Sequence, residues 1–188
     1  MMRKLILMIT LTFFLIQCSK KEDPFLISSA NVGKLSKDTH VSELDSVFKE
    51  DSLVKIENNT KFALGGKLYY EVYEKGGKQL LSITPSAQEG SMEAIQNVQV
   101  YDDRFTTDKG ISLKSTFGDI KNKYKIKSII TTLRNIVVTL ADSDIYFTIS
   151  KEELPEDLRY GSQKIESVQI PEEARIKYMM IDLSPKKK

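Results

Sequence analysis

The side chains that most often carry out chemistry in proteins are scarce in this sequence. Cys18 is the single cysteine and His40 the single histidine among 188 residues. A single histidine excludes a multi-histidine zinc site. No serine or cysteine nucleophile motif accompanies His40, so we interpret it as a solvated residue at a helix start rather than as a general base. The sequence therefore predicts no catalytic residue, no metal site and no cofactor.

Three short motifs resemble ligand-binding loops but are better explained as turns. Gly65-Gly66 and Gly76-Gly77 flank a strand instead of opening a helix, as a phosphate-binding loop would. Asp142-Ser143-Asp144 has the alternation of a calcium loop, but the glycine and the final glutamate of an EF-hand are missing. One enzymatic alternative stays open, because a pair of carboxylates distant in sequence could hydrolyse a glycan.

Cys18 stands at the end of an apolar run. Arg3 and Lys4 precede the run from Leu5 to Ile16, which is shorter than the roughly 20 residues of a membrane-spanning helix and suits a secretory signal. Leu15-Ile16-Gln17-Cys18 resembles the lipobox of bacterial lipoproteins, in which the cysteine is diacylated and becomes the mature N-terminus. The resemblance implies an exported protein anchored by lipid at Cys18, on the periplasmic or surface face of the outer membrane. The alternative is a signal peptide cut elsewhere, with Cys18 unmodified.

The expected organisation is a signal peptide over residues 1–17, a lipid-anchored tether over 18–30 and one globular domain over 31–188. The tether is polar, and its Lys21-Glu22-Asp23 resembles the signal that sends some Bacteroidota lipoproteins to the cell surface. The chain has 28 basic and 26 acidic residues, and the signal removes two basic ones. The mature chain is then formally neutral, so we expect no nucleic-acid partner.

The globular part contains an internal repeat, with units of about 31–105 and 106–188. Leu35 to Leu44 aligns without a gap onto Ile111 to Ile120. Each copy predicts a short amphipathic helix, with Thr39 or Ser115 as the N-terminal cap. The apolar positions of each helix fall on one stripe, made of Val41, Leu44 and Phe48 in the first copy and of Phe117, Ile120 and Tyr124 in the second.

Strand patterns follow each predicted helix. In the first unit we expect strands at Leu53 to Glu57, Lys67 to Glu74, Lys78 to Thr84 and Met92 to Tyr101, with a tight hairpin turn at Lys75-Gly76-Gly77. In the second we expect them at Ile126 to Leu133, Ile136 to Ala141, Ile145 to Ile149, Ser167 to Ile170 and Arg175 to Leu183. The predicted fold class is α+β, with two tandem units of one helix and several antiparallel strands.

These features together resemble a group of uncharacterised Bacteroidota lipoproteins. The resemblance lies in the lipobox and tether, in Lys109 to Ile120 and in Ile145 to Ile149. More distantly, tandem helix-plus-sheet units are similar to the beta-lactamase-inhibitor-protein repeat and to small outer-membrane-assembly lipoproteins. The first group implies no activity, and the second implies binding to another protein.

Four residues form the predicted binding surface. Strand alternation places Tyr69 and Tyr73 on the face opposite Tyr70 and Val72, where they would form an exposed aromatic pair. Tyr101 and Arg104 would border the same surface. The alternative is that both faces are covered and the tyrosines belong to the core. The function expected is a non-catalytic envelope module that binds a protein or glycan, and the alternative is the glycan hydrolase.

Overall fold

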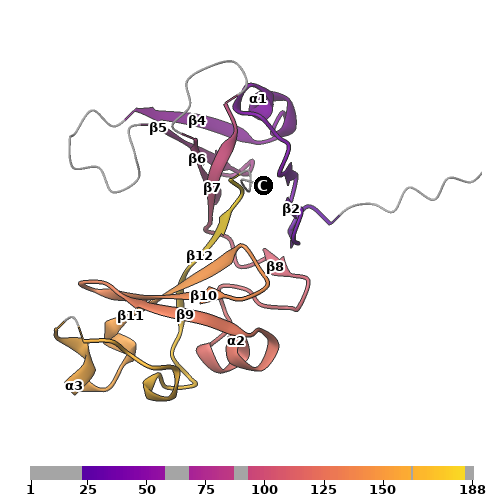
Figure 1. The fold of residues 1–188 in the computed structure, drawn as a ribbon. Helices are drawn as coiled ribbons and strands as arrows, with labels where there is room; N and C mark the ends of the chain where they lie inside the picture. Colours follow the sequence, from indigo (N-terminus) through magenta and orange to yellow (C-terminus); the bar gives the residue numbers. More distant parts are fainter. Residues whose placement is uncertain (1–22, 58–67, 87–92, 162, 185–188) are drawn as a thin grey trace, which may run out of the picture.

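An antiparallel sheet of eight strands connects the two halves of the chain in the computed structural model (Figure 1). The structure describes residues 23–57, 68–86, 93–161 and 163–184. The expected signal peptide, Cys18 and the beginning of the tether lie outside these residues. The strand order is β4-β5-β6-β7-β12-β11-β10-β9. The fold is α+β and mainly antiparallel, with two tandem units of a short helix followed by strands, as predicted.

Each unit contributes four consecutive strands to the large sheet. The first unit has a 3-10 turn over Val41–Glu43, α1 (Leu44–Val47), β4 (Ser52–Glu57), β5 (Leu68–Tyr73), β6 (Gln79–Pro85) and β7 (Ile95–Val100). The second has α2 (Phe117–Lys123), β9 (Ile126–Thr131), β10 (Asn135–Leu140), β11 (Ile145–Ser150) and β12 (Ile176–Asp182). A 3-10 turn over Lys151–Glu153, α3 (Glu156–Arg159) and a further 3-10 turn over Ser167–Gln169 lie between β11 and β12.

A second, small sheet was not predicted. Its order is β3 (Leu35–Ser36), β2 (Asn31–Val32), β1 (Leu26–Ile27) and β8 (Thr106–Thr107). The expected tether, which ran to residue 30, is therefore too long, because Leu26 and Ile27 already pair with β8. Ile27 is 0% exposed, and burial of its side chain offsets the cost of ordering this polar segment.

The two units repeat the same local contacts. In each unit, the first N–H of the helical segment donates to a backbone carbonyl just before the unit's last strand. The backbone N–H of the residue after the helix donates to a carbonyl within the helix. These bonds are Val41 N to Glu93 O, Phe117 N to Ala174 O, Phe48 N to Leu44 O and Tyr124 N to Ile120 O, with lengths of 2.8 to 2.9 Å. The repeated contacts place each helix beside the start of its own last strand.

The helix caps lie one residue later than predicted. Thr39 is not the cap, because its hydroxyl accepts from Ser36 N at 3.0 Å and closes the preceding turn. His40 takes the cap position instead. In the second unit Ser115 closes the equivalent turn and Thr116 caps α2.

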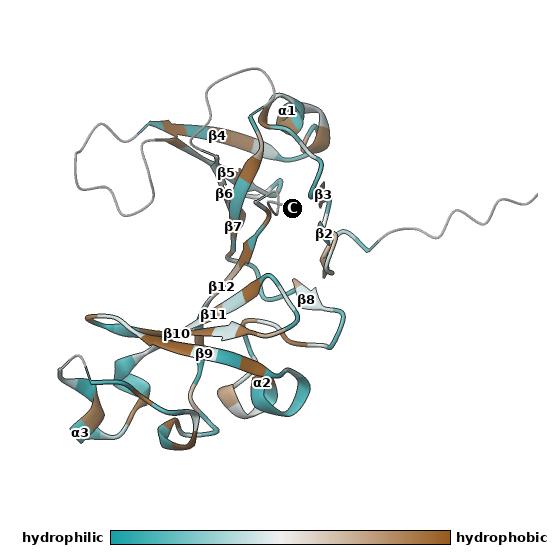
Figure 2. Cartoon of the chain, viewed as in Figure 1, coloured by the Kyte–Doolittle hydropathy of each residue, from teal (hydrophilic) through white to brown (hydrophobic). Residues whose placement is uncertain are grey.

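The predicted apolar stripes do face the core. Leu44, Phe48, Phe117 and Ile120 are all less than 5% exposed, and Val41 and Tyr124 pack against the same cluster. Figure 2 shows hydrophilic residues on the outer side of α2, and both hydrophobic and hydrophilic ones along the outer strands β4 and β9. No helix in the described ranges is long and apolar enough to cross a membrane.

One predicted strand is wrong. Ser167 to Ile170 was expected to be extended, but Ser167–Gln169 forms a 3-10 turn. A strand needs a partner for its backbone, and β12 already occupies the free side of β11. Ile170 is nevertheless 4% exposed and packs in the core, whereas Val168 is 92% exposed.

Candidate binding face of the large sheet

The two faces of the large sheet differ in composition because side chains alternate along each strand. One face carries the core, with Val72, Ile83 and Val98 all 0% exposed. The opposite face lines an open hollow of about 830 Å³, to which seven of the eight strands contribute. That volume lies within the usual range for ligand sites, about 300–1,000 Å³.

Paired residues form a continuous row across this hollow. Each member lies directly opposite the next on the neighbouring strand, so the row runs at right angles to the strands from the first unit into the second. The row is Glu71, Ser82, Gln99, Met180, Tyr146 and Thr139, from β5 to β10. Five strand spacings make it about 24 Å long. The middle of the row lies where β7 meets β12, which is the joint between the two units.

Tyr69 and Tyr101 of the predicted surface both line the hollow. Tyr101 is 42% exposed, and burial of the rest of its side chain, together with the nearby charge of Glu71, raises the pKa of its phenol. Tyr73 lies beside them without lining the hollow, and its hydroxyl donates to Glu71 Oε2 at 2.6 Å. This hydrogen bond raises the pKa of Tyr73 as well. Both phenols therefore remain protonated at neutral pH, and the Tyr73 hydroxyl already donates its one proton to Glu71.

Arg104 does not border this surface. Its Nη2 lies 2.6 Å from Asp102 Oδ2 and 2.8 Å from Glu74 Oε2, and its guanidinium stacks over the Phe25 ring at 4.3 Å. Asp102 is 0% exposed and needs a cation to remain charged there. Burial by itself would raise the pKa of Asp102, but hydrogen bonds from Arg104 and Lys78 hold it well below its usual range. Arg104 thus neutralises a buried charge.

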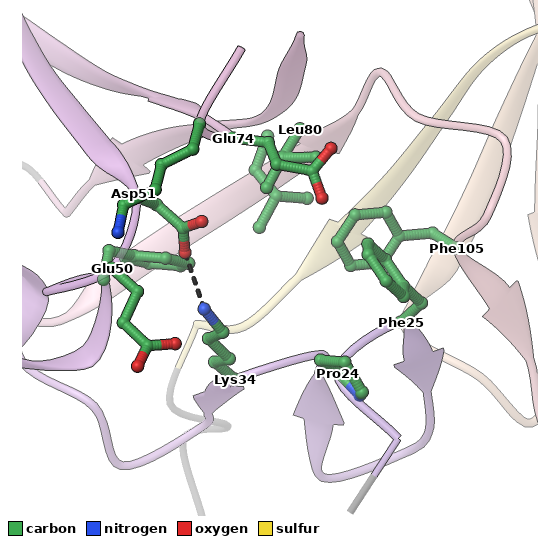
Figure 3. A pocket seen from close by; sticks show the side chains of 11 residues that line it. Pro24, Phe25, Lys34, Glu50, Asp51, Glu74, Leu80 and Phe105 are labelled. Carbon is green, nitrogen blue, oxygen red and sulfur yellow. Dashed lines mark hydrogen bonds and ion pairs between the residues drawn. The ribbon is translucent and has the colours of Figure 1, made fainter. Parts of the chain in front are cut away.

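A second hollow, of about 500 Å³, lies between the small sheet and the first unit (Figure 3). Its apolar wall includes Phe25 and Phe105, whose rings meet edge to face with centroids 5.1 Å apart. At its rim Lys34 Nζ lies 2.6 Å from Asp51 Oδ2. These contacts fasten the beginning of the described chain to the first unit.

The residues that sequence reasoning missed come equally from the two units. Tyr146, Met180 and Asp182 line the hollow beside Asn97 and Gln99 of the first unit. Asn97 Nδ2 donates to the Tyr146 hydroxyl and so links the two units. Asn97 and Gln99 alternate with Val98 and Val100, and this pattern predicts a strand with one face open to solvent. The pairing of β7 with β12, which brings Tyr146 close, had no such signal.

The charged groups of the hollow are few. Glu71 and Asp182 are acidic, and none of the described residues that line it is Lys, Arg or His. The two acids sit three strand spacings apart, about 14 Å between backbones. In the described ranges no three His, Cys, Asp or Glu residues gather as a metal site. The arrangement is suited to stacking and hydrogen bonding.

The comparisons with known proteins bear on the fold. No family model matches the sequence, and no curated protein matches it. Among solved structures, the crystal structure of the uncharacterized protein YfeY from Escherichia coli is similar, with a TM-score of 0.54 and 17% sequence identity. The match covers 83% of this chain and 98% of that one. At this identity the likeness shows a shared fold alone.

Proposed function

We propose that this protein is a non-catalytic, lipid-anchored module of the cell envelope that binds its ligand through the open face of the large sheet. The observation that carries the proposal is the hollow of about 830 Å³, lined by tyrosine, amide and hydroxyl side chains from both units. A lining of this kind offers flat rings for stacking and many hydrogen-bonding groups. The resemblance to tandem helix-plus-sheet binding modules supports the same function.

The location in the envelope rests on the sequence alone. The apolar run and Cys18 motif support export and acylation, and Cys18 lies only a few residues before the first described residue, Asp23. A short tether of this kind would hold the domain close to the membrane surface. The hydrolase alternative has no specific observation in its favour, because Glu71 and Asp182 stand on strands three spacings apart.

Removal of the aromatic groups that line the hollow tests the proposal. Tyr69→Ser combined with Tyr101→Ser should abolish ligand capture, because tyrosine anchors each cost about 2 kcal/mol or more when truncated. The matched control is Tyr160→Ser, since Tyr160 follows α3 and is 77% exposed outside the hollow. Affinity-tagged full-length protein is recovered from detergent-solubilised envelopes, and its bound proteins and glycans are identified.

The proposal requires a ligand that wild type and Tyr160→Ser retain and that the double variant loses. Circular dichroism melts of all three proteins check that the double variant is folded. Capture of the same ligand in equal amount by the folded double variant would show that the open face is not the binding site.

A further inference from the structure

The charge of the hollow limits the ligands that fit it. The chain carries 28 Lys and Arg residues, yet none of the described residues lining the hollow is cationic. An anionic ligand would find no counter-charge there and would be repelled by Glu71 and Asp182. These two carboxylates are also partly satisfied within the protein: Glu71 accepts from the Tyr73 hydroxyl at 2.6 Å, and Asp182 accepts from Ser184 N at 2.9 Å.

Three uncharged polar side chains of the hollow are free to bind. Ser82, Thr84 and Gln99 make no side-chain hydrogen bond to another described residue, although all three line the hollow. Ser82 and Gln99 lie directly opposite one another on β6 and β7. Hydroxyl and amide groups both donate and accept hydrogen bonds, and so do the hydroxyl groups of sugars.

The aromatic groups add a surface for stacking. Tyr69 and Tyr101 line the same hollow, and 42% of Tyr101 is exposed. The face of an aromatic ring is electron-rich and attracts the slightly positive C–H groups of an apolar or sugar surface. The row from Glu71 to Thr139 extends for about 24 Å across the strands, which gives room for several linked units of a polymer.

A peptide strand is a poorer fit. Peptides that bind sheets as an added strand gain affinity from backbone hydrogen bonds at a sheet edge. The hollow lies on a face, where the backbone groups of β6, β7 and β12 already pair with neighbouring strands on both sides. The surface therefore offers side chains only.

We infer that the ligand of the open face is an uncharged glycan chain, bound along the Glu71 to Thr139 row by stacking on Tyr69 and Tyr101 and by hydrogen bonds to Ser82, Thr84 and Gln99. This inference rests on the proposed function. It commits to polysaccharide of neutral sugars as the principal ligand and excludes anionic polymers.

Calorimetric titration of the full-length protein in detergent tests the inference. The probes are neutral hexasaccharides of glucose, mannose, galactose, xylose and N-acetylglucosamine, with hexagalacturonic acid as the anionic probe and hexalysine as the cationic one. Because the chain has eight tyrosines and no tryptophan, tyrosine fluorescence gives a second readout of binding in the hollow. At least one neutral hexasaccharide should bind, and the two charged probes should not.

Variants connect the binding to the row. Gln99→Ala and, separately, Ser82→Ala should weaken the neutral hexasaccharide at least tenfold, whereas Tyr160→Ser should stay within twofold of wild type. The inference is overturned if no neutral hexasaccharide binds, if a charged probe binds more tightly, or if both row variants bind as wild type does. If the double tyrosine variant loses a captured protein that neutral glycans do not displace, the proposed function stands and the glycan inference fails.

Discussion

Replacement of Asp102 by Asn probes the buried charge cluster beside β7. Asp102 Oδ1 accepts from the backbone N of Arg104 at 2.9 Å, and Oδ2 accepts from its Nη2 at 2.6 Å. Lys78 Nζ lies 3.1 Å from Oδ2. The substitution keeps the shape of the side chain, removes its charge and turns one acceptor oxygen into a donor that faces Lys78 and Arg104.

The expected loss of stability follows from the burial of Asp102. Removing one partner of a buried ion pair costs about 3–5 kcal/mol, because the other charge loses its compensation. The Arg104 side chain is 39% exposed and retains Glu74, so it can recruit water and the loss should fall near the lower limit, about 3 kcal/mol. For a domain of this size that corresponds to a fall in Tm of about 6–12 °C.

The effect should depend on pH in a defined direction. The pKa of Asp102 is held well below its usual range in the folded protein, whereas an unfolded Asp has a pKa of about 3.9. The folded state therefore gains stability from the carboxylate above about pH 4 and loses it as the pH falls towards the folded pKa. The difference between wild type and Asp102→Asn should be constant from about pH 5 to 7 and should shrink below about pH 4.

Urea denaturation at pH values from 3 to 7 measures this difference. The matched control is Asp103→Asn, because Asp103 is the adjacent residue and its side chain is 36% exposed, with Lys114 Nζ 2.7 Å away. The control should lose less than about 1 kcal/mol, as is typical of exposed ion pairs. A loss at Asp102 no larger than at Asp103, or a loss that does not change with pH, would refute the reasoning.

Two further predictions concern the repeat and the anchor. Leu44→Ala and Ile120→Ala should each cost about 2–5 kcal/mol in denaturant melts because both side chains are at most 1% exposed, whereas Lys121→Ala, which loses only an exposed ion pair with Glu172, should cost under about 0.5 kcal/mol. Equal, small losses of unfolding free energy in all three variants would contradict the assignment of Leu44 and Ile120 to the buried side of their helices. Cys18→Ala should move the protein out of the detergent phase in a partitioning assay, because the variant has no thiol to acylate. Even one acyl chain binds membranes only marginally, so a protein without any acyl chain should have no lipid anchor. A variant that partitions like wild type would place the anchor elsewhere.

Local patterns in the sequence determined the units of this fold. The apolar stripes of the two helices, the alternation in the strands and the turn at Gly76-Gly77 depend on neighbouring residues, and each is present in the structure. Gly76 and Gly77 have φ values of 111° and 87°, which glycine adopts without strain. The two-fold occurrence of one pattern likewise predicted tandem units of a helix and antiparallel strands.

Contacts distant in sequence decided what local patterns did not show. His40 rather than Thr39 caps the first helix because the Thr39 hydroxyl closes the preceding turn. Ser167 to Gln169 does not form a strand because β12 occupies the place beside β11. Arg104 was predicted at a binding surface because the segment from Tyr101 to Phe105 is polar with aromatic flanks, but the buried carboxylate of Asp102 holds it elsewhere.

The candidate site depended both on local sequence patterns and on contacts between distant segments. Strand alternation was sufficient to place Tyr69 on the face opposite the core. The presence of Tyr146 in the same hollow required β7 to pair with β12 and β12 with β11. Such pairing is selected by the joint burial of both units' apolar faces in one core, a property of the whole chain that no short segment of sequence encodes.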